Sequence, residues 1–506
     1  MAPSAPTAAA SGSARGAASG SHPAYVPVLS NFIGGMWVDA RASGTVDVFN
    51  PATGKVIAKT PLSTRGDVDA AVAAAKAAFP AWRATPVVER ARTMFAFKNR
   101  LEEHFEELAR IVTTEHGKTL DESRGSVRRG IECVEVACGM PSLMMGSGLE
   151  EISRGIDCDV HRQPLGVFAA IAPFNFPAMV PLWFLPTAVA TGNTFVLKPS
   201  ELVPLSQKRI FELLETCVPP GVVNVVNGGV DVVNGFCEHP DVRGVSFVGS
   251  TPVARHVYRT GTNAGKRVQA LGGAKNFIVV MPDANMDKSI GIVSESCYGC
   301  AGERCLAGSI VVTVGKSHGD VRERLVAAAK SIKVGDGADA GVSMGPVIRE
   351  SARQRVISYI EKGLAEGAEL LLDGRGHTVK GREKGFFLGP TVFDKVNPKS
   401  SIGREEIFGP VLSIMNVPDL PAALELLHAH PQANATSIFT SSGKAAREFA
   451  MHAPPAMVGV NIGVAAPMSF FPFGGSKESF FGDVKAHGRD GVIFYTEQKV
   501  VIERWF

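Results

Sequence analysis

The residues best suited to chemistry are a cysteine and an asparagine in two separate stretches of sequence. Cys305 lies in GCAGERCLAGS, where small neighbours would let a substrate reach the sulfur and Arg304 would favour the thiolate. Cys297 and Cys300 are competing thiols in less open sequence, and a buried, inert cysteine is the alternative for all three. Asn175, in APFNFP, lies between prolines and aromatics, so a rigid loop could present its amide to a developing oxyanion. A plain turn asparagine is the alternative there.

Two further segments could hold a nucleotide. Gly249-Ser250-Thr251 follows a predicted strand and precedes a helix, whose N-terminal N–H groups would suit a pyrophosphate. The full GxGxxG pattern is absent, because Ala254 stands where a second glycine is expected, so an ordinary tight turn is equally compatible. Lys198-Pro199-Ser200-Glu201 leaves a strand at the edge where doubly wound sheets bind ligands. Its lysine and carboxylate could grip ribose hydroxyls, and the carboxylate would repel the 2′-phosphate of NADP, although a solvated loop also fits.

Short apolar runs alternating with helical patterns surround these residues. Predicted strands lie at 194–199, 222–226, 244–250 and 277–281, with helices around 206–216, 231–238 and from Pro252. This alternation predicts a parallel sheet of Rossmann type. A second α/β set begins with SIVVTV (309–314), continues through helices at 320–331 and 350–366 and reaches the strand before Asn416. It predicts a second α/β domain.

The remaining segments have simpler patterns. Thr64 and Asp67 resemble a capping box at the start of a helix that we expect to end at Pro80, and residues 89–146 are mostly helical in pattern. Residues 152–166 and 494–505 alternate apolar and polar side chains. Both are predicted to be exposed strands, which could pair with one another or with a neighbouring subunit.

Composition narrows the classes of function. With 506 residues the chain is long enough for two or three domains, and its net charge of +3 without basic blocks gives nucleic-acid binding little support. The eight cysteines form no paired metal-ligand sets, so no metal site is predicted and reduced thiols in a cytosolic-type compartment are favoured. The apolar stretch 169–197 contains four prolines and two asparagines, which favour a buried loop and helix over a membrane span.

Residues 1–22 are rich in Ala, Ser and Gly and contain no acidic residue. They are interpreted as a disordered tail of a cytoplasmic protein. A transit peptide, which would place the protein in the mitochondrial matrix, is the alternative.

Seven motifs in one order carry a resemblance to a known family: APFNFP, KPSE, FVGS, LGGAKN, GERC, EEIFGP and FPFGG. From about residue 30 to the C-terminus the chain closely resembles the aldehyde dehydrogenase superfamily. Within it, APFNFPAMVPLWFLP, DVVNGFCEHP, GAKN, AGERC and FFPFGG look most like the CoA-acylating methylmalonate-semialdehyde dehydrogenases.

The resemblance implies an α/β fold with a Rossmann-type NAD-binding domain, a second α/β catalytic domain and a small β oligomerisation arm. It also implies a homodimer or homotetramer. The corresponding boundaries are a disordered tail at 1–28, the NAD-binding domain at 29–150 and 168–273, the catalytic domain at 274–475, and oligomerisation strands at 151–167 and 485–506.

The resemblance also implies roles for individual residues. Cys305 would be the nucleophile, and Asn175 with the Cys305 backbone N–H would form the oxyanion hole. The residues implied to bind NAD are Ala172 and Phe174 beside the cofactor, Lys198 and Glu201 at the adenosine ribose, Leu202 at the adenine, Ser250 at the pyrophosphate, and Gly272 and Glu406 at the nicotinamide end.

One departure from the hydrolytic members of the family bears on the acyl acceptor. Those members usually carry a glutamate in a LELGGK-like motif as general base for the deacylating water, and Ala270 stands at that position here. Without a positioned base, attack by water should slow by roughly 10²–10⁴-fold, whereas a thiol such as coenzyme A needs less help. A CoA-acylating enzyme is therefore expected. The alternatives are a hydrolytic dehydrogenase of another semialdehyde, with Glu303 or Glu406 as base, and a catalytically silent structural relative.

The carboxylate of a semialdehyde substrate requires a cation, because a guanidinium can hold a carboxylate in a bidentate fork. Arg304, beside the nucleophile, and Arg129, on a helix expected to line the substrate tunnel, are the candidates. Arg128 could take the place of Arg129 as the substrate-binding residue. A surface arginine in a helix ion pair, with no role in binding, is the other interpretation of this position. The resemblance implies oxidation of malonate or methylmalonate semialdehyde, with loss of carbon dioxide and formation of acetyl-CoA or propionyl-CoA. No local motif identifies the CoA site.

Overall fold

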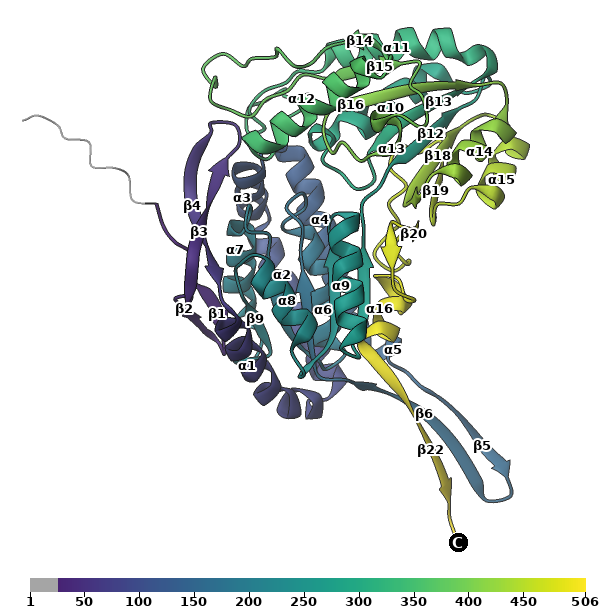
Figure 1. The fold of residues 1–506 in the computed structure, drawn as a ribbon. Helices are drawn as coiled ribbons and strands as arrows, with labels where there is room; N and C mark the ends of the chain where they lie inside the picture. The colour runs from purple at the N-terminus through teal and green to yellow at the C-terminus, as the bar shows by residue number, and fades with distance from the viewer. Residues whose placement is uncertain (1–25) are drawn as a thin grey trace, which may run out of the picture.

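The computed structural model describes residues 26–506 and contains two large sheets, each covered by helices, with a narrow arm projecting from one end (Figure 1). The predicted α/β fold with a Rossmann-type sheet, a second α/β sheet and a small β arm is confirmed. Most of the predicted N-terminal tail, and with it the alternative of a transit peptide, lies outside the described residues.

The first sheet has eight strands in the order β2-β1-β9-β8-β7-β10-β11-β21. Its five central strands are parallel, whereas β1, β2 and β21 pair antiparallel at the edges. The strands are β1 (Asn31–Ile33), β2 (Met36–Val38), β7 (Val167–Ile171), β8 (Thr194–Lys198), β9 (Val223–Val225), β10 (Val242–Val248), β11 (Arg267–Leu271) and β21 (Phe480–Phe481). The β7 and β8 residues are all buried, because helices cover both faces of the sheet.

Two hydrophobic clusters join this sheet to its helices. One cluster packs α2 (Val87–Glu103), α3 (Phe105–His116), α4 (Leu120–Cys138), α6 (Met179–Ala190) and α7 (Leu205–Leu214) against it. The other packs α1 (Arg65–Ala84), α8 (Val230–Glu238) and α9 (Thr251–Asn263). The apolar stretch 169–197 is thus buried core, as predicted. Among residues 26–506, no helix is long and apolar enough to span a membrane.

Helix α1 corrects one prediction. Its capping box is present, since the Asp67 carboxylate accepts the backbone N–H of Thr64 at 3.0 Å. The predicted end at Pro80 is wrong, because the helix continues to Ala84. Trp82, in that extra turn, is buried, and its indole donates to the Val189 carbonyl at 2.9 Å. Tertiary packing of this tryptophan therefore overrides the helix-breaking tendency of the proline.

The second sheet has seven strands in the order β14-β15-β16-β13-β12-β18-β19, all parallel except the β14–β15 pair. The strands are β12 (Asn276–Val280), β13 (Gly308–Val314), β14 (Glu369–Leu372), β15 (Thr391–Asp394), β16 (Val411–Val417), β18 (Ala435–Phe439) and β19 (Met457–Val460). The helices around it are α10 (Met286–Tyr298), α11 (His318–Ser331), α12 (Glu350–Ala365), α13 (Ser401–Arg404), α14 (Leu420–Ala429) and α15 (Gly443–His452).

Two small sheets complete the body of the molecule. The strands β3 (Ala42–Asn50) and β4 (Lys55–Ser63) form a hairpin, and β17 (Gln432–Ala433) pairs with β20 (Ser476–Lys477).

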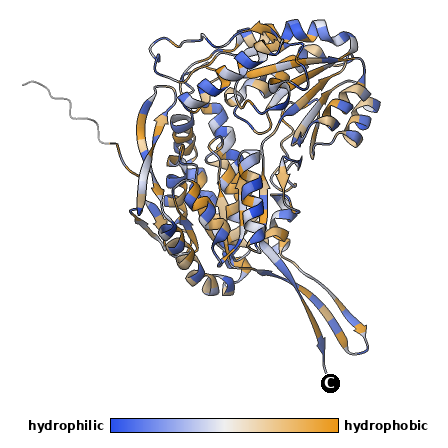
Figure 2. Cartoon of the chain, viewed as in Figure 1, coloured by the Kyte–Doolittle hydropathy of each residue, from blue (hydrophilic) through white to orange (hydrophobic). Residues whose placement is uncertain are grey.

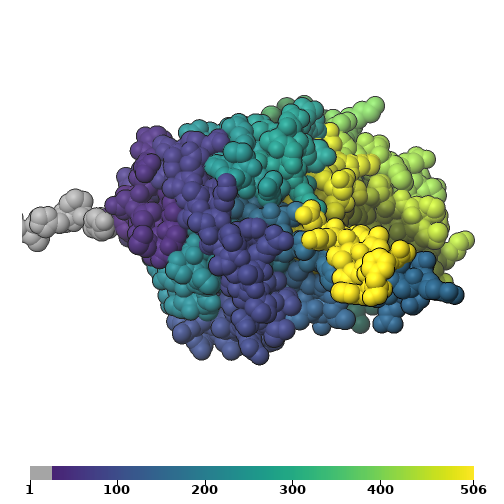
Figure 3. All heavy atoms as spheres, turned by 90° about the horizontal axis from the view of Figure 1, so that it is seen from below, coloured from purple at the N-terminus to yellow at the C-terminus, as the bar shows by residue number. Residues whose placement is uncertain are grey.

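The arm is a three-stranded sheet in the order β22-β6-β5, formed by β5 (Ser147–Ser153), β6 (Ile156–Pro164) and β22 (Thr496–Arg504). Of the two pairings that the sequence left open, the segments pair with one another, because β22 runs antiparallel to β6 from Thr496 opposite Pro164 to Arg504 opposite Ile156. Figure 3 shows these segments side by side, and Figure 2 shows alternating hydrophobic and hydrophilic residues along them. Val500 and Ile502 are 58% and 66% exposed.

The C-terminal strand of the arm is shorter than the range 485–506 assigned to it from the sequence. Residues Gly488–Tyr495 form helix α16, which packs against α6 rather than joining the arm. Tyr495 is buried there, and its hydroxyl hydrogen-bonds the Ser246 hydroxyl at 2.9 Å.

Candidate active site

A cavity of about 730 Å³ lies where the carboxyl ends of the first sheet's strands face the second sheet. Four neighbouring strands end at its wall: β7 leads into residues 172–175, β8 into Lys198, β10 into Ser250 and β11 into Gly272. This edge is where open parallel sheets bind ligands. All ten residues predicted as catalytic or cofactor-binding line the cavity, namely Ala172, Phe174, Asn175, Lys198, Glu201, Leu202, Ser250, Gly272, Cys305 and Glu406.

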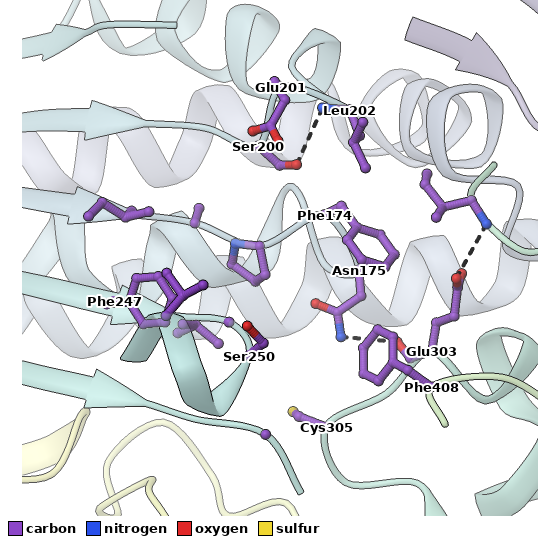
Figure 4. Close-up of a pocket in the computed structure, with 18 of the residues that line it drawn as sticks. Phe174, Asn175, Ser200, Glu201, Leu202, Phe247, Ser250, Glu303, Cys305 and Phe408 are labelled. Carbon is purple, nitrogen blue, oxygen red and sulfur yellow. Dashed lines mark hydrogen bonds between the residues drawn. The ribbon is translucent and has the colours of Figure 1, made fainter. Parts of the chain in front are cut away.

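Cys305 is the cysteine that this cavity exposes. Of the three thiols weighed from the sequence, Cys297 and Cys300 are 4% and 2% exposed and do not line the cavity, whereas Cys305 does. Figure 4 shows Cys305, Asn175 and Ser250 around one part of the cavity. Burial, and secondarily the Glu406 carboxylate, raise the pKa of the Cys305 thiol to about 12. A thiol with this pKa is protonated at neutral pH, and a positive charge nearby favours the thiolate.

The loop that carries Cys305 has an unusual backbone. Cys300, Ala301 and Gly302 have φ values of 52°, 52° and 73°, so three successive residues occupy the left-handed region. Each non-glycine residue there costs free energy, and such a turn persists only when its surroundings hold it. A Cβ atom at Gly302 would lie 2.2 Å from the Gly409 carbonyl oxygen, so a glycine is required at that position.

Side-chain amides hold the same loop from several directions. Asn276 and Asn434 each donate from Nδ2 to the Cys305 carbonyl at 2.9 Å. Asn175 donates from Nδ2 to the Glu303 carbonyl at 3.0 Å. An amide nitrogen has two N–H donors, so Asn175 keeps a second one for an oxyanion. The backbone of Asn175 is fixed as well, because the buried Lys118 ammonium donates to its carbonyl at 2.5 Å.

The other wall of the cavity has groups that suit a dinucleotide. Lys198 Nζ lies 3.0 Å from the Glu201 carboxylate. Burial alone would raise the pKa of Glu201, but Lys198, together with a backbone hydrogen bond and Arg349, outweighs burial and lowers the pKa, so the carboxylate is ionised at neutral pH. Ser250, which lines the cavity, is the N-cap of α9, and the free N–H groups of a helix N-terminus suit an anion such as a pyrophosphate. A Cβ at Gly273 would lie 2.4 Å from the Glu406 carboxylate, so only a glycine at position 273 leaves room for the Glu406 side chain. These residues fit NAD.

The carboxylates around the cavity bear on whether water could be activated. Ala270 is fully buried in β11 and offers no base. Burial raises the pKa of Glu303 to about 8, and Figure 4 shows its side chain directed away from Cys305, where it accepts the Ile348 N–H at 3.4 Å. Burial also raises the pKa of Glu406, whose Oε1 accepts the Ala274 N–H at 3.0 Å.

The candidate arginines are placed differently from the other predicted residues, because neither Arg129 nor Arg304 lines the cavity. Arg129 Nη2 donates to the Ala466 carbonyl at 3.3 Å, and its Nη1 lies 3.2 Å from the Glu132 carboxylate. Arg304 Nη2 donates to Glu122 at 3.1 Å. Arg128, the alternative to Arg129, forms two hydrogen bonds with Glu102 of α2 and so points to another surface.

Several residues of the site escaped sequence reasoning. Asn276 is the last residue of the LGGAKN motif, so its place in that motif was an available signal, although no role was assigned to it. Asn434 lies 129 residues from Cys305 and had no such signal. Phe408, Arg349 and Arg355 also line the cavity, although the sequence did not single them out.

Comparison with known proteins agrees with this geometry. Residues 37–501 match the model of the aldehyde dehydrogenase family. The chain is 52% identical to malonate-semialdehyde dehydrogenase 1 of Geobacillus thermodenitrificans over 95% of this chain and 99% of that protein. It is 42% identical to a protein of Sinorhizobium meliloti, assigned as a methylmalonate-semialdehyde dehydrogenase and solved with NAD, with a TM-score of 0.94 over 96% and 99% of the two chains. It is 45% identical to the methylmalonate-semialdehyde dehydrogenase of Oceanimonas doudoroffii, and the two structures superpose with a TM-score of 0.93 over 95% of this chain and 99% of that chain.

Proposed function

The chain belongs to the aldehyde dehydrogenase family, and on that premise we propose that it is an NAD-dependent, CoA-acylating dehydrogenase of malonate or methylmalonate semialdehyde. The observation that carries the proposal is the single cavity that brings Cys305 and Asn175 together with all eight cofactor candidates. Relatives named for these two semialdehydes, at 42–52% identity, support the substrate class.

Cys305 would act as the nucleophile. Its thiol loses the proton to solvent, and the thiolate attacks the aldehyde carbon to give a hemithioacetal oxyanion. Asn175 Nδ2 and the Cys305 backbone N–H would donate to that oxyanion. Such donors typically contribute 10²–10³-fold each to the rate. Lys198, Glu201, Ser250 and Glu406 would hold NAD, which when bound supplies the acceptor for the hydride leaving the substrate carbon.

The acyl group then remains as a thioester on Cys305. In a malonyl-type thioester, the free carboxylate can leave as carbon dioxide, because the electrons of the broken carbon–carbon bond pass to the thioester carbonyl, and the resulting enolate takes a proton. The thiol of coenzyme A loses its proton and attacks the thioester carbon, and the Cys305 thiolate leaves. The products are acetyl-CoA or propionyl-CoA, and the nucleophile is regenerated.

Coenzyme A is favoured over water as acceptor by the carboxylates around the cavity. Ala270 provides no base, and the Glu303 carboxylate is directed away from the sulfur. A thiol ionises more readily than water and is the stronger nucleophile, so it depends less on a positioned base. A hydrolytic dehydrogenase would require Glu303 to turn towards Cys305, or Glu406 to release the Ala274 N–H.

The test is NADH formation from methylmalonate semialdehyde with and without coenzyme A, followed by mass identification of the product. Turnover that requires coenzyme A and yields propionyl-CoA is expected. Equal turnover without coenzyme A, giving a free acid, would assign the chain to the hydrolytic alternative. NAD binding without turnover of any aldehyde would indicate a catalytically silent relative.

A further inference from the structure

Lys118 joins two helices directly behind the segment that carries Asn175. Helix α3 ends at Gly117, whose φ of 91° makes it a left-handed C-cap, and α4 begins with Thr119 as its N-cap. Lys118 is the single residue between these two caps. A Cβ at Gly337 would lie 2.3 Å from the Lys118 carbonyl oxygen, so the chain packs tightly here. The caps and this packing therefore hold the backbone of the lysine in one place.

The Lys118 side chain makes two contacts with the segment that carries Asn175. Lys118 is 1% exposed, its Nζ donates to the Asn175 carbonyl at 2.5 Å, and the same Nζ lies 3.8 Å from the centre of the Phe176 ring. Burial lowers the pKa of Lys118, whereas Cys300 and Glu122 raise it. A carbonyl oxygen and an aromatic face both present negative charge to a cation, so these contacts also favour the ammonium form.

The segment that carries Asn175 depends on such contacts, because it has no helix or strand of its own. It links β7 to α6, and its two prolines have no backbone N–H to donate. Lys118 holds the Asn175 carbonyl, while the Asn175 Nδ2 donates to the Glu303 carbonyl at 3.0 Å. These two contacts act at opposite ends of the same residue. Together they fix the direction in which the second N–H of the amide points.

We propose that Lys118 is a positioning residue that aims the Asn175 amide at the oxyanion, so that the rate of aldehyde oxidation depends on its ammonium through Asn175. This inference rests on the proposed function, in which Asn175 donates to the oxyanion formed from the aldehyde. Lys118 does not line the cavity and touches neither the aldehyde nor the cofactor. It acts through the Asn175 backbone.

The test is a double-mutant cycle between Lys118→Met and Asn175→Ala in the full-length protein. The rate of the NADH burst from methylmalonate semialdehyde is measured without coenzyme A, so that only the steps up to the thioester contribute. Methionine is an unbranched side chain without a charge or an N–H donor. With Asn175 present, Lys118→Met should slow the burst roughly 10- to 100-fold, because misplacing a group by about 1 Å can cost that much.

The Asn175→Ala background separates positioning from a general structural effect. Alanine lacks the amide but keeps the backbone carbonyl that Lys118 binds. If Lys118 acts through the amide, Lys118→Met should slow the burst of this variant by less than about threefold, since the interaction that it supports is already lost. Equal losses in the two backgrounds, or no loss with Asn175 present, would overturn the inference.

A second measurement distinguishes the oxyanion donor from the nucleophile, because Lys118 also lies near Cys300 of the nucleophile loop. Alkylation of Cys305 by iodoacetamide displaces iodide and requires no oxyanion donor. Lys118→Met should therefore leave the alkylation rate and the KM for NAD within about threefold of wild type. An alkylation rate that falls as much as the burst would place the effect at the sulfur and contradict the inference.

Lys266→Met is the matched control. Lys266 is 7% exposed, and its ammonium also donates to two backbone carbonyls, those of His239 and Val242. Val242 is the first residue of β10, so this lysine lies at the amino end of the sheet, opposite the cavity. The substitution should lower the melting temperature and leave the burst rate at the wild-type level. A burst slowed as much as in Lys118→Met would show that loss of any buried lysine has this effect.

Phe176→Leu tests the same contact if Lys118→Met does not fold. Leucine removes the aromatic face beside the ammonium and leaves Lys118 itself in place. The burst should slow by about two- to fivefold, and only when Asn175 is present. A loss of the same size in the Asn175→Ala background would overturn the inference. Wild-type protein that gives no NADH burst with any aldehyde would instead contradict the proposed function itself.

Discussion

The two walls of the cavity are built in different ways. On the cofactor wall, Lys198 and Glu201 are three residues apart and pair with each other at the end of β8, while Ser250 and Gly272 follow the ends of β10 and β11. On the nucleophile wall, the loop is held by partners far away in sequence. Asn434 is 129 residues from Cys305, Asn175 is 128 from Glu303, and Glu122 is 178 from Cys300.

This difference predicts that the cofactor wall determines NAD affinity and the nucleophile wall determines the reaction rate. The cofactor wall follows from regular parallel-sheet geometry and local pairing, so changes there should weaken binding with little effect on chemistry. The nucleophile wall is a costly left-handed turn kept in place by long-range hydrogen bonds, so changes there should reduce the rate with little effect on cofactor affinity. Substitutions in the two walls can therefore be compared by their effects on kcat and on NAD binding.

The largest effect is expected for Cys305→Ala. Without the sulfur no thioester can form, so NADH production should fall by at least about 10³-fold, while NAD affinity changes little. Stopped-flow absorbance and fluorescence titration with NAD measure the two quantities. Cys300→Ala is not a neutral control, because Cys300 contacts Arg304, whereas the remote Cys217→Ala is suitable. Retained NADH production in Cys305→Ala would falsify the assignment of the nucleophile.

A smaller loss is expected for Asn175→Ala. It removes a candidate oxyanion donor and the hydrogen bond to the Glu303 carbonyl, so kcat should fall roughly 10²–10³-fold with an unchanged KM for NAD. Steady-state kinetics at saturating aldehyde measures this change. Asn285→Ala, which alters the N-cap of α10, is the matched amide control. A rise in the NAD KM with unchanged kcat would place Asn175 functionally on the cofactor wall.

Lys198→Ala tests the cofactor wall. We expect the opposite of the Asn175→Ala result, with a changed KM for NAD and a nearly constant kcat. Loss of a charged donor at the proposed ribose site should raise the KM for NAD about 30-fold and leave kcat within about threefold. Varying NAD at saturating aldehyde and coenzyme A provides both numbers. Lys76→Ala, which removes an exposed ion pair with Asp241, is the control. If kcat fell while the NAD KM stayed constant, the proposed separation between the two walls would be wrong.

The smallest expected effect is that of NAD, bound at the cofactor wall, on the pKa of the Cys305 thiol in the nucleophile wall. Burial and the Glu406 carboxylate raise the pKa of the Cys305 thiol to about 12, so the thiolate fraction, and with it the rate of iodoacetamide alkylation, should increase tenfold per pH unit between pH 7 and 10. NAD brings a positively charged nicotinamide towards the same cavity. It should lower that pKa and accelerate alkylation by about tenfold at pH 7.5.

Mass spectrometry of the peptide containing Cys305 follows the rate with and without NAD. Cys297, which is buried away from the cavity, serves as an internal control in the same digest. An alkylation rate that is independent of NAD would show that the cofactor does not influence the nucleophile electrostatically.

The amino-acid sequence by itself determined much of the fold and of the cofactor wall. Strand and helix patterns are local, so the parallel strands around Lys198 and Ser250 and the exposed strands of the arm could be predicted from it, whereas the partner of each arm strand stayed open. The motifs also identified Cys305 and Asn175 as the residues to examine, because the rigid and small-residue segments that contain them are visible without a structure.

The tertiary structure alone decided the rest, since it depends on contacts between distant parts of the chain. Helix α1 passes through Pro80 because Trp82 packs against the core, and residues 488–495 form a helix because Tyr495 is buried beside Ser246. Asn434 and Glu122 hold the nucleophile loop from more than a hundred residues away. No local pattern encodes such partners, because side-chain hydrogen bonds across a fold depend on packing and not on sequence spacing.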